Sequence, residues 1–420
     1  MEDKFMNGMQ CVFIAEILKE GIDNALDRMT NEGGTNALLL FTHHDYITAK
    51  NWNIKLTHTN SEDTSIEGYW FNFDSKYYKD TVIKPIESKT PGLKNRDAFM
   101  EIATAAKEKG LKVYALIVHR PAAVHHAEEY DKYEELHMRT VNGQKVPAVL
   151  CQNQPEVKKF YSALFDNLDD RYREIIDGFC LALTDHYALF GFETLTDELA
   201  DTLGIKRFSN PEMGLSCFCN VCVKQAKEQG IDVEKIKKGL LKGIELGYIP
   251  EKIERMSKAA EVIRFLLDIP EYLEWLRFRS SIHTEMHKRL YKYIKDKKSS
   301  YEVGLDIYGA KDDWKYQSRF PEIAKYCDWC KLMYYSSTYG EPLTPEDIGG
   351  GVKVAKSLTD KPIYSGIFAH NTEPPEKVKE GIDYSIKNGA DGIVLSWDYA
   401  AVPFENMNVA KKRLKELGKV

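Results

Sequence analysis

Short apolar runs alternate with amphipathic stretches along the chain. Several of the runs follow a glycine suited to end a helix, such as Gly110 and Gly389. Near-continuous apolar strands separated by helices are typical of a parallel sheet that is buried on both faces. The pattern predicts strands at residues 11–17, 36–44, 111–120, 177–186, 301–310, 328–335, 361–368 and 391–399.

Eight such strands predict a closed (β/α)8 barrel, one domain over residues 1–420. Such a barrel needs about 250 residues, so the remainder is expected in loops at the carboxyl ends of the strands. Residues 45–94 form an aromatic-rich insertion after the second strand, which we interpret as a lid or an interface. Residues 187–270, after the fourth strand, hold a cysteine cluster and a Lys/Glu-rich helical tract. A split into two domains near residue 200 would leave four strands and an open edge in each half.

Composition narrows the class of protein. The net charge of −6 is spread along the chain, which disfavours nucleic acid and anionic lipid as partners. No window approaches the roughly 18 to 20 apolar residues of a membrane span, and eight cysteines in a long chain fit a reducing compartment. The sequence has no recognisable phosphate-binding loop, so we expect no organic cofactor. We expect a cytoplasmic protein with a small carbohydrate substrate, no nucleic-acid or membrane partner, and possible homo-oligomers.

Acidic residues at the carboxyl ends of the predicted strands are candidate catalytic groups, because barrel active sites form at that end. Asp185 ends the fourth strand, Asp306 lies in the fifth, and Asp398 closes the eighth. Two carboxylates can act as acid and as nucleophile or base across a glycosidic bond, and their separation sets the stereochemical outcome. Alternatively, such an acid caps the following helix or pairs with a neighbour such as His186.

Other residues at this end are candidates for binding the substrate, since aromatic rings stack on sugars and polar side chains hold hydroxyl groups. The alternatives are core histidines, wall aromatics and a buried salt bridge. A second hypothesis is a metal-dependent isomerase or hydrolase whose divalent ion is held by Glu16, His43, His119 and Asp185. A third is a sugar-binding barrel without catalysis. The candidate substrate-binding residues are Glu16, His43, His119, His186, Tyr334, Tyr335 and Trp397.

Three cysteines lie close together in the stretch SCFCNVC, residues 216–222. Thiolates of Cys217, Cys219 and Cys222 can surround one metal ion, and a site closed by four thiolates leaves no position for a reactive water. Ordinary buried thiols at the start of a helix are the alternative. Cys327 and Cys330 have no second pair beside them, which favours core packing.

Several segments together resemble a large group of bacterial and archaeal glycoside-hydrolase-like barrel proteins. This resemblance implies a (β/α)8 barrel that acts on glycosides through a carboxylate pair. The cysteine spacing is similar to the zinc cluster of some microbial β-galactosidases, in which a fourth, upstream cysteine completes the site. For this fourth ligand, Cys151 in a loop is favoured over Cys180 in a strand. The segments are CQNQPEVKKFYSALFDNLDDRY, IDGFCLALTDHY, CFCNVCVKQAKEQGID, WLRFRSS, VGLDIYGA, AKYCDWCKLMYY and NGADGIVLSWDYAAVPFENM.

Overall fold

The computed structural model describes residues 5–48, 55–59, 65–118, 133–183, 216–245, 266–310, 313, 317–333 and 343–420. Eight parallel strands form a closed barrel, so the predicted (β/α)8 fold class is confirmed. Around the barrel the order is β1–β12–β11–β10–β9–β8–β5–β2. The strands are β1 (Met6–Cys11), β2 (Ala37–Phe41), β5 (Lys112–Val118), β8 (Gly178–Ala182), β9 (Glu302–Ile307), β10 (Trp329–Leu332), β11 (Ile363–Phe368) and β12 (Gly392–Ser396).

The first strand was predicted at the wrong position. The apolar residues 11–17 mostly form the start of helix α1 (Ile14–Glu20), and the strand precedes them. The strand contains Asn7 and Gln10, which made it look unlike a buried element. Both side chains are buried, and each has a partner far away in sequence: the Asn7 amide donates to Gly33 O at 2.8 Å, and Gln10 accepts from Lys331.

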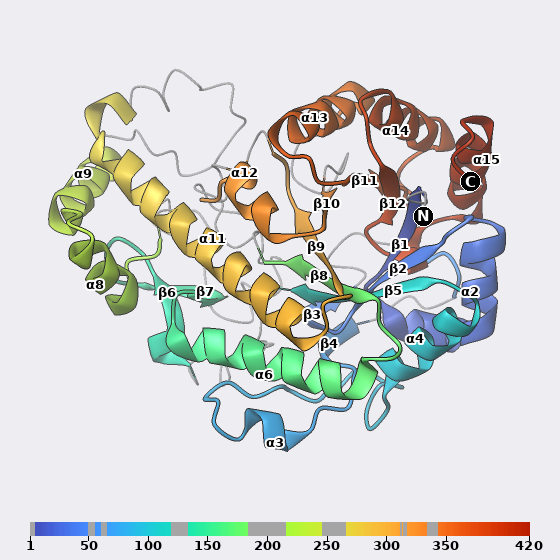
Figure 1. The fold of residues 1–420 in the computed structure, drawn as a ribbon, viewed down its shortest axis with the longest axis horizontal. Helices are drawn as coiled ribbons and strands as arrows, with labels where there is room; N and C mark the ends of the chain where they lie inside the picture. Colours follow the sequence, from blue (N-terminus) through green and yellow to red (C-terminus); the bar gives the residue numbers. More distant parts are fainter. Residues whose placement is uncertain are drawn as a thin grey trace.

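Helices surround the barrel, as Figure 1 shows. Helices α13, α14 and α15 lie next to one another in sequence order, while the long α6 and α11 cover another side, with α8 and α9 beyond them (Figure 1). None of the described helices is both long and apolar enough to cross a membrane. Further helices are α2 (Ile22–Asn31), α3 (Ser75–Tyr78), α4 (Ala98–Glu108), α6 (Pro155–Tyr172), α8 (Asn220–Glu228), α9 (Val233–Glu245), α11 (Glu271–Lys297), α12 (Phe320–Ile323), α13 (Pro345–Leu358), α14 (Pro375–Lys387) and α15 (Phe404–Glu416).

A repeated contact locks the amino ends of the strands. The residue just before every second barrel strand is Asp or Asn, and its side chain accepts a hydrogen bond from a backbone amide of the preceding strand. Its own backbone amide donates to the carbonyl of that same residue, which closes a small ring. The pairs, with the side-chain bond, are Asn36 with Asn7 (3.0 Å), Asp177 with Val113 (2.7 Å), Asp328 with Val303 (2.8 Å) and Asp391 with Ile363 (2.8 Å).

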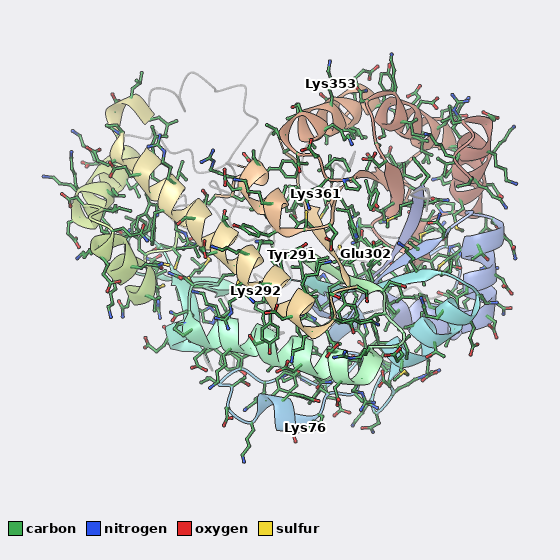
Figure 2. All side chains as sticks on the ribbon, in the orientation of Figure 1. Lys76, Tyr291, Lys292, Glu302, Lys353 and Lys361 are labelled. Carbon is green, nitrogen blue, oxygen red and sulfur yellow. The ribbon has the colours of Figure 1, made fainter. Side chains whose placement is uncertain are left out.

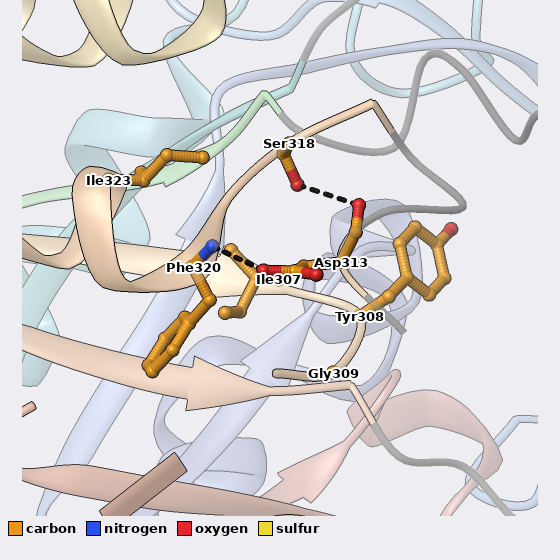
Figure 3. Close-up of a pocket in the computed structure, with 7 residues that line it drawn as sticks. All are labelled: Ile307, Tyr308, Gly309, Asp313, Ser318, Phe320 and Ile323. Carbon is orange, nitrogen blue, oxygen red and sulfur yellow. Dashed lines mark hydrogen bonds between the residues drawn. The ribbon is translucent and has the colours of Figure 1, made fainter. Parts of the chain in front are cut away.

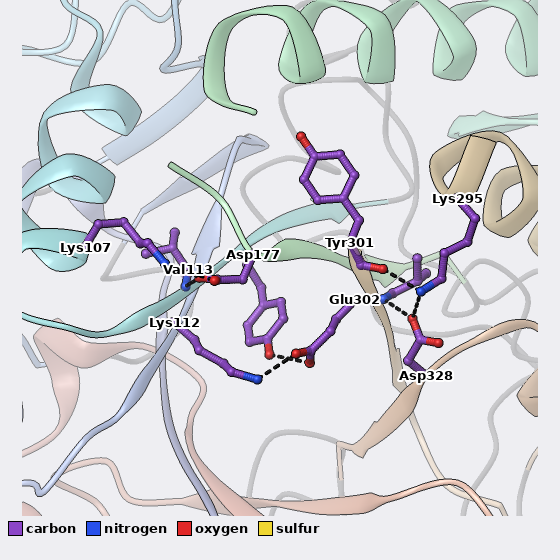
Figure 4. Close-up of polar contacts among 10 residues, drawn as sticks. Lys107, Lys112, Val113, Asp177, Lys295, Tyr301, Glu302 and Asp328 are labelled. Atoms are coloured by element: carbon purple, nitrogen blue, oxygen red, sulfur yellow. Dashed lines mark hydrogen bonds and ion pairs between the residues drawn. The ribbon is translucent and has the colours of Figure 1, made fainter. Parts of the chain in front are cut away.

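A lysine from the surrounding helices neutralises each of the three aspartates. Lys107 of α4 lies 2.9 Å from Asp177, and Lys295 of α11 lies 2.7 Å from Asp328, as Figure 4 shows. Lys356 of α13 lies 2.9 Å from Asp391. These contacts connect strand to strand and strand to helix, so this end of the barrel serves stability.

The barrel interior is aromatic near the same end. The ring of Trp329 lies 5.1 Å from that of Tyr114 and 5.3 Å from that of Tyr364. Opposite Trp329 on the next strand is Gly304, where an added Cβ would lie 2.1 Å from the indole. A glycine is therefore required at this position for the indole to fill the barrel.

The aromatic insertion begins with an antiparallel pair, β3 (His43–Thr48) and β4 (Ser65–Tyr69). Its described aromatic rings pack against helix α6: Tyr69 and Tyr78 contact Phe160, and Phe71 contacts Tyr172. In this part of the insertion, aromatic content therefore serves packing of the barrel wall. The interpretation of residues 45–94 as a whole as a lid or an interface stays a prediction, and so do the bounds 187–270 of the second insertion.

A second hairpin, β6 (His137–Arg139) with β7 (Lys145–Leu150), follows β5 and was not predicted. It joins α8, α9 and the first part of α11 in a hydrophobic cluster separate from that of the barrel. The cluster includes Phe218 stacked on Trp275 at 4.3 Å, next to the cysteines. This small core supports the loops that follow β5 and β8.

Candidate functional site

Charged and polar side chains meet inside the barrel near the carboxyl ends of its strands. Lys331 of β10 lies 2.9 and 3.1 Å from the two carboxylate oxygens of Asp306 on β9, and it donates to Gln10 Oε1 at 2.7 Å. Ser396 of β12 also donates to Gln10 Oε1, at 3.3 Å. Lys331 and Asp306 are 0% and 1% exposed, so this is a buried ion pair.

Lys331 was missed in the sequence. Its signal was a lysine inside the apolar run DWCKLMYY, since a charge in a buried strand needs a partner. The register pairs Lys331 directly with Asp306 across neighbouring strands.

Asp398, just after β12, binds backbone amides. Its Oδ1 accepts from Val12 N at 2.7 Å and Phe13 N at 3.1 Å, and its Oδ2 accepts from Ala400 N at 3.2 Å. Burial raises the pKa of Asp398 to about 7, although these three hydrogen bonds act in the opposite direction. The side chain thus joins the end of the last strand to the segment between β1 and α1.

His370 and Trp397 lie beside Asp398. The His370 Nε2 accepts hydrogen bonds from the backbone amides of Trp397 at 3.1 Å and Asp398 at 3.3 Å. Burial lowers the pKa of His370 to about 3, so the ring is neutral at physiological pH. Trp397 is 5% exposed, and its ring lies 6.2 Å from that of Phe13. These described contacts are those of a wall residue.

Glu16 does not end a barrel strand, contrary to the prediction, because it lies in the first turn of α1. It is buried, its Oε1 lies 2.7 Å from Lys19 Nζ, and its Oε2 accepts from the Thr59 hydroxyl. Glu16 therefore forms a salt bridge in which its own side chain is buried and that of Lys19 is 44% exposed. Its role in binding the substrate stays a prediction.

His43 begins β3 outside the barrel. Its Nδ1 lies 2.8 Å from Thr42 Oγ1, and its ring stacks on Tyr69 at 4.4 Å with an angle of 10°. Five other predicted site residues lie outside the described residues, so their geometry plays no part here: His119, Asp185, His186, Tyr334 and Tyr335.

A hollow follows the end of β9, with about 260 Å³ of empty space when open solvent is included. Asp313 closes the loop beside it, since its Oδ2 accepts from Phe320 N at 2.6 Å and its carbonyl accepts from Ser318 Oγ at 3.2 Å (Figure 3). The tyrosine ring of Tyr308 stands next to Asp313 in the same view. The lining residues are Ile307, Tyr308, Gly309, Asp313, Ser318, Phe320 and Ile323.

The four predicted thiols meet in the second core. The sulfur atoms of Cys151, Cys217, Cys219 and Cys222 all lie within 4.8 Å of one another, and all four residues are buried. Cys151 directly follows β7, Cys219 is the N-cap of α8, and Cys222 lies in its first turn. Cys180, the other candidate for the fourth position, lies in β8 and is not part of this group.

This donor set fits a tetrahedral metal ion. Zinc binds sulfur at about 2.3 Å, which places the sulfurs of a tetrahedron about 3.8 Å apart, and the sulfurs of Cys151 and Cys222 are 3.5 Å apart. Hydrogen bonds among the thiols lower the pKa values of Cys151 and Cys219, whereas burial raises those of Cys217 and Cys222 well above the usual value. Among the described residues, this is the one group of three or more His, Cys, Asp or Glu side chains arranged to hold a metal.

Donors around the sulfurs complete the arrangement. The backbone amides of Arg139 and Cys219 each lie 3.4 Å from Cys217 Sγ. The guanidinium of Arg279 on α11 lies 3.0 Å from Cys222 Sγ. Such donors stabilise thiolates, the form that binds metal. By contrast, Cys327 and Cys330, with sulfurs 3.4 Å apart, belong to no such group among the described residues.

The fold of the chain is similar to that of several solved glycoside hydrolases. The chain matches a β-galactosidase from Halorubrum lacusprofundi (TM-score 0.58, 12% identity, 99% of this chain and 58% of that one). It matches α-L-fucosidase isoenzyme 2 from Paenibacillus thiaminolyticus (TM-score 0.55, 12% identity, 99% of this chain and 50% of that one). It also matches the catalytic domain of a β-amylase from Paenibacillus polymyxa (TM-score 0.54, 12% identity, 99% of this chain and 97% of that one).

These matches confirm the predicted resemblance to glycoside-hydrolase barrels at the level of the fold. The chain spans between half and three fifths of the fucosidase and of the Halorubrum β-galactosidase. No protein-family model and no curated protein matches the sequence.

Proposed function

We propose that this protein is a glycoside hydrolase whose carboxylates act at the carboxyl end of the barrel. The observation that carries the proposal is Asp306, a buried carboxylate near the carboxyl end of a barrel strand and paired with Lys331. A buried carboxylate at this end of a barrel is a candidate functional group because its burial is costly without a partner or a use. The glycoside-hydrolase fold of the matched structures supports a carbohydrate as the substrate.

The contacts of Asp306 and Asp398, the two candidate acids among the described residues, support different roles. Asp306 lies 2.9 Å from the Lys331 ammonium, an ion pair that suits a nucleophile or general base. Asp185 is proposed as the general acid. Asp398 remains the alternative for one of the two roles; its three backbone hydrogen bonds also suit a residue that positions the neighbouring Trp397.

We propose that the sugar is bound by His119, His186, Tyr334, Tyr335 and Trp397, the predicted residues that follow the strands. Glu16 and His43 have contacts that suit structural roles, which weakens the alternative of a catalytic metal ion held by both.

The proposal is tested by a screen with chromogenic glycosides on the purified chain. For any substrate cleaved by the wild type, Asp306→Asn and Asp185→Asn are each expected to lower kcat by at least about 100-fold, because each removes a reacting carboxylate. Asp296→Asn, an exposed residue on α11, is the matched control and should retain full activity. Melting curves confirm that each variant is folded.

Unchanged activity in both Asp306→Asn and Asp185→Asn would overturn the proposal. Tight sugar binding by the wild type without turnover would favour the sugar-binding barrel instead. Activity lost on treatment with a chelator, together with a metal ion other than one bound by thiols, would favour the metal-dependent enzyme.

We also propose that Cys151, Cys217, Cys219 and Cys222 hold a structural zinc ion. Four thiolates fill a tetrahedral zinc completely, so the ion would join the loops after β5 and β8 and leave no open position for catalysis. Cys219→Ser is expected to lower zinc content and melting temperature before it affects turnover. Lost turnover with unchanged melting and unchanged zinc would contradict this role.

A further inference from the structure

A buried arginine connects the thiol cluster to the loop that follows β9. Arg279 lies on α11 and is 0% exposed. Its Nη1 donates to Cys222 Sγ at 3.0 Å, and its Nε donates to Gln317 Oε1 at 3.2 Å. The planar guanidinium thus spans a sulfur on one side and an amide oxygen on the other, a geometry that a lysine ammonium does not reproduce.

Gln317 completes a second connection to the cysteine loop. Its Nε2 donates to the carbonyl of Ser216, directly before Cys217, at 2.9 Å. Gln317 is 2% exposed. Its φ of 51° lies in the left-handed region, which residues other than glycine rarely adopt. The backbone is therefore held at this point by the contacts of the side chain.

The residue after Gln317 belongs to the wall of the hollow. Ser318 lines it, and Ser318 N donates to Asp313 O at 3.1 Å. Phe320, also in the lining, donates to the Asp313 carboxylate. The chain of contacts thus runs from the sulfur of Cys222 through Arg279 and Gln317 to the loop beside the barrel end.

The charge of the metal cluster explains why a cationic side chain lies beside it. Four thiolates with one divalent ion carry two negative charges in a buried place, and a cationic donor offsets part of that charge. The Arg279 guanidinium lies 3.0 Å from Cys222 Sγ and also donates to Gln317, so a divalent ion held by the four thiolates would keep Arg279, and with it Gln317, in place.

We infer that Arg279 is a positioning residue that stabilises a divalent metal ion in the thiol cluster and, through Gln317, couples that ion to the wall of the hollow after β9. The inference rests on the proposed zinc site and goes beyond it, because it assigns the site an effect on the barrel end. It is independent of whether the barrel cleaves glycosides.

The test compares zinc affinity, measured by competition with a chromophoric chelator, and hydrogen exchange in residues 317–323. Arg279→Met is expected to weaken zinc binding about 10- to 100-fold, the usual effect of losing an outer-shell partner. It should also speed exchange in residues 317–323 about fivefold, the equivalent of one net hydrogen bond. Removal of zinc from the wild type should speed exchange in the same residues.

Two further variants distinguish the effect of the positive charge at residue 279 from the effect of its hydrogen bond to Gln317. Arg279→Lys should recover part of the zinc affinity but not the protection of residues 317–323. Gln317→Ala should weaken zinc binding by no more than about fivefold, because the coupling is reciprocal, and should speed exchange in residues 318–323. Arg277→Met, an exposed arginine on the same helix, is the matched control and should change neither quantity.

The outcomes are distinct. If the wild-type chain binds no zinc, the proposed metal site itself is wrong. If the wild type binds zinc and Arg279→Met binds it as tightly, or if zinc removal leaves exchange in residues 317–323 unchanged, this inference is wrong and the metal site stands. Should Arg279→Met not fold, Gln317→Ala and zinc removal from the wild type still decide the coupling.

Discussion

The two ends of the barrel both use acidic side chains, but in opposite environments. At the amino end, Asp177, Asp328 and Asp391 are partly exposed, and each pairs with a lysine from a nearby helix and with a strand amide. At the carboxyl end, Asp306 and Asp398 are 1% exposed. At the amino end the same contact, an aspartate bound to a lysine and to a strand amide, is repeated, whereas each acid at the carboxyl end has different partners.

This difference indicates how stability and function are divided. A repeated, partly hydrated contact contributes a modest amount each time and tolerates change. A buried charge costs much to desolvate, so losing its partner has a large effect. The carboxyl end should therefore be the more sensitive of the two, and its pH dependence should differ.

The largest effect is expected for Lys331→Met. The change leaves the Asp306 carboxylate buried without its cation and should lower the free energy of unfolding by about 3–5 kcal/mol, as measured by urea denaturation. The double variant Lys331→Met/Asp306→Leu removes both charges and should recover most of that loss. A double variant no more stable than Lys331→Met would show that the ion pair does not explain the sensitivity.

An intermediate effect is expected from the titration of Asp398. Because its pKa is raised to about 7 in the folded chain, the folded state holds a proton that the unfolded state has released between pH 7 and pH 4. Stability from this group therefore increases as the pH falls from about 7 to about 4, with a slope of up to about 1.4 kcal/mol per pH unit.

The measurement compares unfolding free energies of the wild type and Asp398→Asn at about pH 5 and about pH 8. The wild type should gain stability at the lower pH relative to the variant, which has no proton to bind at this position. Parallel pH profiles for the two chains would contradict the raised pKa.

The smallest effect is expected at the amino end. Asp328→Asn keeps an acceptor for the Val303 amide but loses the charge that faces Lys295, which should cost about 1 kcal/mol and should fall as salt is added. The control is Asp296→Asn, whose partner Lys292 lies on the outside of α11 (Figure 2) and is 75% exposed. If Asp328→Asn lowered the free energy of unfolding by more than about 3 kcal/mol, as expected for a buried pair, the two ends of the barrel would not differ in sensitivity.

Much of the barrel could be predicted because seven of its strands are buried on both faces and read as apolar runs. The same rule failed for β1, whose Gly8, Asn7 and Gln10 interrupt the pattern. In that strand, burial of the Asn7 and Gln10 side chains is possible because Gly33 and Lys331 supply partners. Such partners come from other elements, and no local pattern indicates them.

The candidate site divides in the same way. The thiol cluster was predicted from the spacing of Cys217, Cys219 and Cys222, and the position of Cys151 in a loop led to the correct fourth member. The pair of Asp306 with Lys331 was not predicted, since it depends on the register between β9 and β10. Likewise, the contact of Arg279 with Cys222 joins α11 to α8 and leaves no trace in the local sequence.

The sequence by itself determined the barrel class, seven strand positions and the set of thiols, because burial and close ligand spacing are recorded in neighbouring residues. Only the tertiary structure decided which charges meet. Lys331 lies opposite Asp306, Asp398 binds the amides of Val12 and Phe13, and Arg279 lies between Cys222 and Gln317. The physical reason is that a buried charge is stabilised by whichever group the fold brings within hydrogen-bond distance, however distant that group is in the chain.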